Sequence, residues 1–473
     1  MSVYSLCKKV QFVSSAPSFH EMDRPSYRIL ISSIPAMGHI NSVVAYGDLM
    51  KSRGHHVIFT QVKIFEKIAL DHGFEFLPLD GDLMNESFAG HLVNWIVENA
   101  NFFENWVESV TNSTKEDAER FGQMFGSHEF DDALERTLNK LCNIDAIIYD
   151  LVYPHPFIAK RPELIGIPII SWNPLSLYRN GPPYFSGLST KETEENNKTE
   201  WEKFGEGFLR LWSTMTEKMK EWYRSAGLDN LADEVEEFLF APKPDHFGFY
   251  HYPADLDYIE LGSPDPGWHR VEACLREPES GEEFKVPEKL VDKPGKLIYF
   301  SMGSLASFDM RAMKKMLSIL AKSPHRFIVS MGKLSEELQL ADNMWGEPFV
   351  DQIKVLKAID MAIIHGGNNS FIETLYFAKP LIIVPYFFDQ FDNAQRIEDK
   401  GIGKRIALWK TSEDEILKAI EDTLINTEAH KKIQEISNNM RTSVTRQKAA
   451  EMIEGLIALK KKESSQSNVK SDA

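Results

Sequence analysis

Two strand–helix units follow one another in residues 345–403, which read WGEPFVDQIKVLKAIDMAIIHGGNNSFIETLYFAKPLIIVPYFFDQFDNAQRIEDKGIG. The apolar strand DMAII (360–364) ends at HGGNNS (365–370), and the helical pattern SFIETLYFA (370–378) begins there. Two glycines let the backbone approach a ligand, and a helix start offers unpaired amides and the positive end of the helix dipole. Such a junction can bind phosphate without a metal, although on these residues alone a plain tight turn is slightly favoured.

The same alternation occupies both halves of the chain. In the first half, strands are expected at RILISSIP (28–35), HVIFTQV (56–62), FEFLPL (74–79), DAIIYD (145–150) and IPIISW (167–172). In the second half, they are expected at KLIYFSMGS (296–304), HRFIVSMG (325–332), DMAIIHGG (360–367) and KPLIIVPY (379–386). Strands that alternate with helices are typical of parallel sheets covered by helices. The sequence therefore predicts an α/β protein with two doubly wound, Rossmann-like domains.

The boundaries between these domains follow from a change in composition. Residues 263–295 are polar and rich in turn-forming residues, which is typical of a linker. The expected divisions are a flexible N-terminus (1–26), an N-terminal domain (27–262), an interdomain linker (263–295), a C-terminal domain (296–440), a helix returning to the N-terminal domain (441–463) and a flexible tail (464–473).

Long helical stretches rich in aromatic residues interrupt the first domain at 88–135 and 198–240. Trp201, Phe204, Phe208 and Trp222 recur at helical spacing and predict one apolar helix face. Most of these rings are expected to form core beneath the insertions. A minority are expected to line an apolar ligand pocket.

Composition narrows the classes of function. The chain has 473 residues, of which 43% are hydrophobic, and 53 basic against 70 acidic residues give a net charge of −17. That surplus repels nucleic-acid phosphates and anionic lipids, so no nucleic-acid or membrane partner is expected. Three scattered cysteines predict neither disulfides nor a zinc site. With no signal peptide or membrane anchor evident, a monomeric cytoplasmic protein is expected.

The spacing of polar residues after residue 350 resembles the donor motif of UDP-glycosyltransferases. The pattern reads Gln352…His365-Gly-Gly-x-Asn-Ser-x-x-Glu373…Pro385-x-x-x-Asp389-Gln390-x-x-Asn393-Ala. The 13-residue step from Gln352 to His365 resembles bacterial macrolide-inactivating enzymes more than plant or vertebrate ones. A cytosolic mite enzyme of bacterial type would fit this pattern.

The resemblance implies a GT-B fold, in which two Rossmann-like domains face each other across a cleft and the C-terminal domain binds the nucleotide sugar. The expected donor residues are Phe349 and Gln352 for the uracil, Glu373 for the ribose, Ser304, His365, Gly367, Asn369 and Ser370 for the diphosphate, and Asp389 and Gln390 for the transferred sugar. Two positions depart from the family pattern: Phe349 stands where tryptophan is usual, and Asp351 stands where proline is usual.

A second group of residues lies in the first half, where PAMG (35–38) precedes His39. On the residues alone, a helix-start histidine without a chemical role is the better interpretation. The resemblance implies instead that His39 is the base that deprotonates an acceptor hydroxyl and that Asp150 orients it. The helix start is expected to lower the pKa of His39 and keep the ring neutral. Ser42 stands where plant relatives usually have proline.

The function implied is that of an inverting glycosyltransferase, which moves glucose from UDP-glucose to a hydroxyl of a small lipophilic acceptor in detoxification. No cofactor and no metal are expected, and the short acidic motifs 80–82 and 255–257 are interpreted as surface loops. Two other functions remain open: a UDP-sugar epimerase of the same fold, and a non-catalytic protein that sequesters a lipophile.

Overall fold

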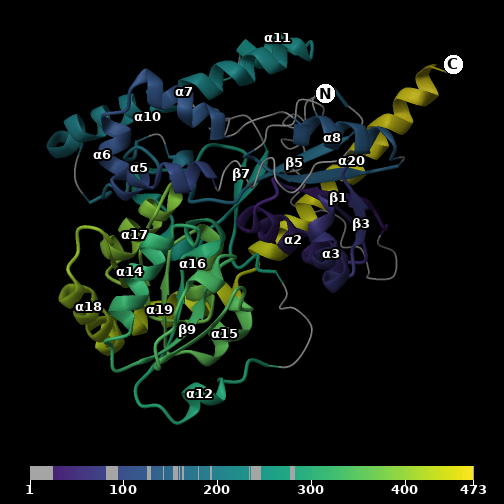
Figure 1. Ribbon diagram of the computed structural model, residues 1–473. Coiled ribbons are helices and arrows are strands. Elements are labelled where there is room, and N and C mark those ends of the chain that lie inside the picture. The colour runs from purple at the N-terminus through teal and green to yellow at the C-terminus, as the bar shows by residue number, and fades with distance from the viewer. Residues whose placement is uncertain are drawn as a thin grey trace.

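The computed structural model shows two α/β domains, each built on its own sheet (Figure 1). It describes residues 25–80, 94–124, 129–141, 143–152, 158, 160–161, 164–178, 180–191, 194–233, 235, 247–276 and 283–471. Residues 1–24, most of the expected flexible N-terminus, lie outside this range. The described chain contains no helix that is both long and apolar enough to cross a membrane.

The N-terminal sheet has seven parallel strands in the order β3-β2-β1-β4-β5-β6-β7. Its strands are β1 (Arg28–Ser32), β2 (His56–Gln61), β3 (Glu75–Pro78), β4 (Ala146–Asp150), β5 (Ile165–Ile170), β6 (Gly248–His251) and β7 (Trp268–Val271). The strand order reverses direction between β1 and β4. In doubly wound folds, ligands bind outside the carboxyl ends of the strands at such a reversal.

The C-terminal sheet has six parallel strands in the order β10-β9-β8-β11-β12-β13 and reverses between β8 and β11. Its strands are β8 (Leu297–Ser301), β9 (Arg326–Ser330), β10 (Met344–Glu347), β11 (Met361–Ile364), β12 (Leu381–Ile383) and β13 (Gly403–Arg405). The predicted architecture of two Rossmann-like domains is therefore confirmed.

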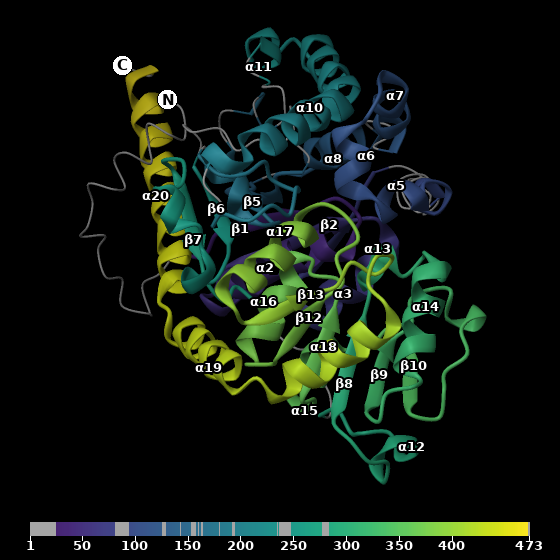
Figure 2. The ribbon, with the colours of Figure 1, turned by 90° about the vertical axis from the view of Figure 1, so that its left-hand side faces the viewer.

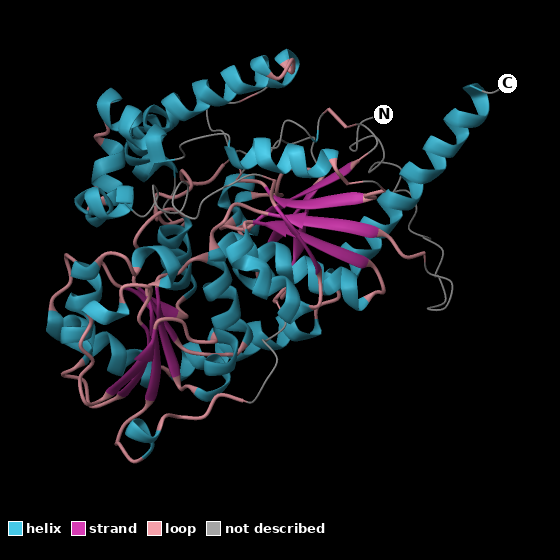
Figure 3. Ribbon diagram, turned by 45° about the vertical axis from the view of Figure 1, so that its right-hand side comes forward, coloured by secondary structure: helices cyan, strands magenta, loops and turns pink. Residues whose placement is uncertain are grey.

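Helices flank both sheets (Figure 3). In the N-terminal domain, α2 (Met37–Ser52) packs on one sheet face, and α8 (Glu129–Asn139) packs on the other. The bounds of α3 are Glu66–His72. The C-terminal domain contains α13 (Gly303–Ala306), α14 (Met310–Leu320), α15 (Gln352–Ala358), α16 (Asn368–Tyr376), α17 (Asp389–Lys400), α18 (Glu413–Ile425) and α19 (Thr427–Thr442).

The aromatic insertions form a helical layer that extends over the C-terminal domain (Figure 1). Its helices are α5 (Ala100–Glu104), α6 (Trp106–Thr111), α7 (Lys115–Met124), α10 (Glu194–Ser225) and α11 (Asp229–Asp233). Trp106, Phe121 and Trp212 are buried and lie within 6.5 Å, ring centre to ring centre, of Phe388 from the C-terminal domain. Many of the predicted rings thus form core, and this core joins the two domains.

Two predicted boundaries need correction. The expected linker 263–295 contains β7, whose four residues extend the N-terminal sheet, and the short helix α12 (Glu288–Val291). Turn-forming residues on both sides of Trp268–Val271 concealed this short strand from its sequence pattern. The last helix, α20 (Thr445–Ser471), continues past residue 463, where it was expected to end. Its apolar residues Ala450, Ile453 and Ile457 pack into the core of the N-terminal domain.

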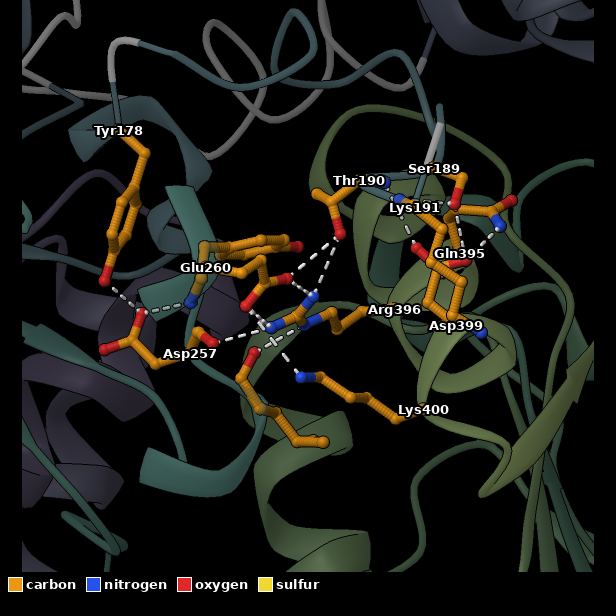
Figure 4. Close-up of polar contacts among 12 residues, drawn as sticks. Tyr178, Ser189, Thr190, Lys191, Asp257, Glu260, Gln395, Arg396, Asp399 and Lys400 are labelled. Atoms are coloured by element: carbon orange, nitrogen blue, oxygen red, sulfur yellow. Dashed lines mark hydrogen bonds and ion pairs between the residues drawn. The ribbon is translucent and has the colours of Figure 1, made fainter. Parts of the chain in front are cut away.

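Helix α17 belongs to the C-terminal domain, but one of its faces contacts the N-terminal domain along its length. Arg396, only 1% exposed, donates to the carbonyls of Leu256 and Asp257 at 2.6 Å each and to both carboxylate oxygens of Glu260 (Figure 4). One turn further, Asp399 accepts from the Ser189 hydroxyl at 2.7 Å. This helix therefore fixes the C-terminal domain against the N-terminal one.

Candidate active site

The predicted functional residues gather at the reversal points of the two sheets. His39 follows β1 and Asp150 ends β4, while Ser304 follows β8 and His365 follows β11. Between the domains, α16 contacts α2, so the two groups face each other (Figure 2). This is the placement that the topology of doubly wound sheets favours for ligand binding.

His39 and Asp150 form a close pair. The Nδ1 atom of His39 lies 2.9 Å from Oδ2 of Asp150, and the other carboxylate oxygen accepts from the Val152 amide at 2.9 Å. Asp150 is buried, whereas the His39 side chain is 26% exposed. Because a carboxylate only accepts hydrogen bonds, Nδ1 carries the proton and Nε2 is left as a base.

The environment of His39 raises the pKa of its ring. Burial alone would lower the pKa below 6.5, but the charge and hydrogen bond of Asp150 outweigh it, and Asp389 adds to their effect. The expected lowering by the helix start is therefore wrong, because the carboxylate is the nearer and stronger charge.

In the C-terminal domain, glycines bring two loops against the ring of His365. A Cβ atom at Gly303 or at Gly367 would lie 2.6 Å from this imidazole, so only glycine fits at either position. Burial lowers the pKa of His365 to about 4, and the ring is uncharged at neutral pH. Ser304 lies in the first turn of α13, directly after Gly303.

A connected polar group surrounds Glu373, which is 3% exposed. The Gln352 amide donates to Glu373 and lies 3.2 Å from the hydroxyl of Ser370. On the other side, the guanidinium of Arg276 lies 3.7 Å from Glu373. Burial raises the pKa of Glu373, and the charge of Arg276 opposes this rise. Phe349 is 59% exposed, which leaves its ring face open to a ligand.

Asn369 connects the predicted donor loop to the helix of the predicted base. Its amide donates to the Gly38 carbonyl and, at 3.0 Å, to the hydroxyl of Ser42. Ser42, which stands where plant relatives usually have proline, thus makes an interdomain contact. Asp351, the other departure, caps α15 by accepting from the Lys354 amide at 3.3 Å.

The two predicted sugar-binding residues begin α17. Asp389 accepts from the Asn368 amide at 3.3 Å, at the start of α16. Burial raises the pKa of Asp389 to about 7, although His39 opposes the rise. Gln390 is buried, and its carbonyl oxygen accepts from the amides of Tyr386 and Phe387 at 2.9 and 3.2 Å. The preceding residue, Phe388, has a φ of 53°, a conformation that a non-glycine residue rarely adopts.

Several residues of the site were missed by the sequence interpretation. The hydroxyl of Ser171 lies 3.0 Å from His39 Nδ1, and buried Asn173 donates to Asn393, which in turn donates to the Gly366 carbonyl at 2.9 Å. Ser171 directly follows β5, next to β4, so the rule that carboxyl ends of parallel strands meet could have identified it. Asn173 and Arg276 lie several residues after the ends of β5 and β7, so neither strand position nor a sequence motif predicted their place in the site.

One acidic motif was misinterpreted. Asp257 is not in a surface loop: it is 1% exposed and accepts from Tyr178 and Tyr250 at 2.7 and 2.8 Å. In the other motif only Asp80 is described, and it pairs with Lys140 at 2.8 Å. Residues 81 and 82 lie outside the described residues. Among those described, no three His, Cys, Asp or Glu side chains are grouped so that they could hold a metal ion.

Comparisons with known proteins find similar sequences over parts of this chain. Residues 282–447 match the family model of UDP-glucoronosyl and UDP-glucosyl transferase. The chain is 30% identical over 169 residues to the uncharacterized UDP-glucosyltransferase YojK of Bacillus subtilis, covering 35% of this chain and 41% of that protein. It is 24% identical over 402 residues to a sterol 3-beta-glucosyltransferase of Leptosphaeria maculans, covering 81% of this chain and 26% of that protein.

Solved structures share the fold over nearly the whole chain. The glycotransferase of kitacinnamycin superposes with a TM-score of 0.66 at 16% identity, over 92% of this chain and all of that one. The sequence matches to the curated relatives named above span less than half of those proteins' length. The C-terminal domain therefore matches the family model of UDP-glucoronosyl and UDP-glucosyl transferase, and the two-domain architecture has the fold of the solved glycosyltransferase.

Proposed function

We propose that this protein transfers a sugar, with glucose as the first candidate, from a UDP-sugar to a hydroxyl of a small lipophilic acceptor and inverts the anomeric carbon. One observation carries the proposal: the His39–Asp150 pair lies beside the start of α16, where Asn369 contacts Gly38. A base from one domain and a helix start suited to phosphate from the other therefore lie close to each other, as transfer from a nucleotide sugar requires. A detoxifying role in the cytoplasm is part of the same proposal.

The proposed reaction is a single displacement. The acceptor oxygen attacks the anomeric carbon from the face opposite UDP, and the bond from that carbon to the diphosphate breaks, so that UDP leaves with the electron pair. Nε2 of His39 takes the acceptor's proton, and Asp150 stabilises the imidazolium that forms. The amides at the start of α16 stabilise the leaving diphosphate.

Both substrates have support in the relatives and in the site. The names of the family model and of the Bacillus relative support a UDP-sugar donor. The fungal relative is named for glucose transfer to a sterol, which supports a lipophilic acceptor hydroxyl. Trp95, Phe102 and Tyr184 are partly buried at the edge of the aromatic core, so they are the rings best placed to line an acceptor pocket.

A screen of phenols, sterols and macrolides with UDP-glucose, analysed by mass spectrometry, tests the proposal. The expected result is an acceptor that gains one hexose, with no reaction when the acceptor is omitted. Conversion of UDP-glucose to an isomer without an acceptor would support an epimerase instead. Binding of lipophiles without transfer to any of them would support a sequestering protein.

Activity is expected to survive EDTA, because the helix start of α16 takes the place of a metal at the diphosphate. Turnover should be the same before and after exhaustive chelation, and added Mn²⁺ or Mg²⁺ should not raise it. If chelation abolished turnover and either ion restored it, the proposed metal-free diphosphate site would be wrong.

Replacing Glu373 by alanine is expected to weaken UDP binding about ten- to hundred-fold, since a hydrogen bond to a charged group contributes about 1.5–3 kcal/mol. The affinity for the acceptor should change little. Titration calorimetry with UDP measures this, and Glu337→Ala, which changes an exposed glutamate, is the control. Unchanged UDP affinity in Glu373→Ala would remove Glu373 from the donor site.

A further inference from the structure

Arg276 is a largely buried cation beside the predicted donor site, and it makes no hydrogen bond to any residue that the structure describes. Its side chain is 13% exposed, and it arrives from the segment that follows β7 of the N-terminal sheet. Within the described residues, its polar partner is Glu373, at 3.7 Å, which is too long for a hydrogen bond. The atom at this distance is Nε, which is shielded from solvent and has no hydrogen-bond partner among the described residues.

Arg396 shows what a structural arginine looks like in this protein. It is also buried, and all three of its nitrogens donate to the carbonyls of Leu256 and Asp257, to Thr190 and to Glu260 (Figure 4). A guanidinium has five N–H donors, and leaving them unpaired in the interior costs free energy. Unlike Arg396, Arg276 has no hydrogen-bond partner for its buried Nε among the described residues, so it lies beside the predicted donor site with a donor available to a ligand.

The charges around Arg276 indicate what kind of ligand it would bind. The residues predicted to hold the diphosphate are neutral: they are serines, an asparagine, a glycine, and His365, which is uncharged at neutral pH. Glu373 and Asp389 add carboxyl groups, and the nearby Lys354 already pairs with Asp351 at 3.4 Å. The two negative charges of a diphosphate would therefore be repelled by these carboxyl groups. The N-terminal end of α16 would offset them with only about half a positive charge. Among the described residues around this site, Arg276 is a cation that can balance these charges.

The backbone before Arg276 directs the segment toward this site. Ala273 has a φ of 51°, a left-handed conformation that is uncommon for a residue other than glycine. Strained residues of this kind occur where the surrounding structure holds a functional group in place. After the turn, Leu275 packs against the main hydrophobic core, so the position of the segment is fixed on both sides of Cys274.

We propose that Arg276 binds the diphosphate of the nucleotide donor. The donor site then includes a residue from the segment that follows β7, the last strand of the N-terminal sheet. The inference rests on the proposed function and extends its donor site. An arginine can give two parallel hydrogen bonds to phosphate oxygens, which lysine cannot. Donor binding would thereby link the segment after β7 to α16.

Titration calorimetry with UDP and with uridine, at low and at high salt, tests this proposal. Arg276→Gln is expected to weaken UDP binding at least about tenfold while uridine affinity stays within about twofold of wild type. Arg276→Lys should give an intermediate loss for UDP, because it keeps the charge but not the paired hydrogen bonds. Lys289→Gln, which removes the same charge from the exposed surface of α12, is the control.

The outcomes separate this proposal from the function itself. Equal losses of UDP and uridine in Arg276→Gln would mean that Arg276 only supports Glu373, and the proposal would fall. Wild-type UDP affinity in Arg276→Gln would overturn it as well. If the wild-type protein bound neither UDP nor uridine, the proposed function would fall with it. Thermal unfolding of each variant shows whether a loss reflects misfolding, and Arg276→Lys keeps the comparison valid if Arg276→Gln does not fold.

Discussion

Replacing His39 by alanine is expected to lower kcat by at least ~10²-fold, which is the usual size of a general-base contribution. UDP affinity should stay near the wild-type value, because the predicted uracil and ribose contacts lie around Glu373 in the other domain. Phenols with a low pKa should lose least, because they are partly ionised without a base. Steady-state kinetics and UDP titration on the same preparation measure both effects.

The matched control for this prediction is His56→Ala, which removes a half-exposed imidazole from β2. It should leave kcat unchanged. A His39→Ala variant that turns over like wild type would show that another group, or none, deprotonates the acceptor.

Asp150→Asn adds a pH readout to the same experiment. The pKa of His39 is raised above 6.5, so the loss of activity toward acid pH should begin above that value as the ring becomes protonated. Without the Asp150 charge, burial would dominate and lower the pKa, and the acid limb should move to lower pH. The kcat losses in the double variant should be less than additive, because an orienting group has little effect once its base is gone.

Replacing Arg396 by alanine is expected to lower the free energy of unfolding by about 2–6 kcal/mol, because two buried carbonyls lose their donors at about 1–3 kcal/mol each. The change removes donors from the buried carbonyls of Leu256 and Asp257 and a ring contact in which Arg396 lies 4.3 Å from the centre of Tyr258. Urea and thermal unfolding, followed by tryptophan fluorescence, measure the loss.

Lys431→Ala is the control for this stability change. Its pair with Glu428 joins side chains that are 69% and 76% exposed, and such pairs contribute at most about 1 kcal/mol. If Arg396→Ala were no less stable than Lys431→Ala, the contact between α17 and the N-terminal domain would not hold the domains together.

The sequence predicted the features that depend on local patterns. Apolar strands that lead into helices identified both parallel sheets. The pairing of His39 with Asp150 came only from the family resemblance, and the structure places the two side chains 2.9 Å apart. Features that depend on tertiary packing were missed. Strand β7 is too short to stand out, Asp257 is buried only because distant tyrosines donate to it, and Arg276 reaches Glu373 through a turn that no motif marks.

The charge state of His39 illustrates the same limit. A helix start is visible in the sequence and predicts a lowered pKa, whereas the carboxylate that raises the pKa lies 111 positions along the chain. Its effect depends on a distance that only the fold supplies.

The measurement that tests the central claim most directly is the anomeric configuration of the glucoside formed from UDP-glucose. NMR gives it from the coupling constant of the anomeric proton. UDP-glucose carries an α linkage, and direct attack by an acceptor activated by His39 gives a β-glucoside. A product with the α configuration would contradict the account, because His39 and α16 could not then act on opposite faces of one sugar in a single displacement.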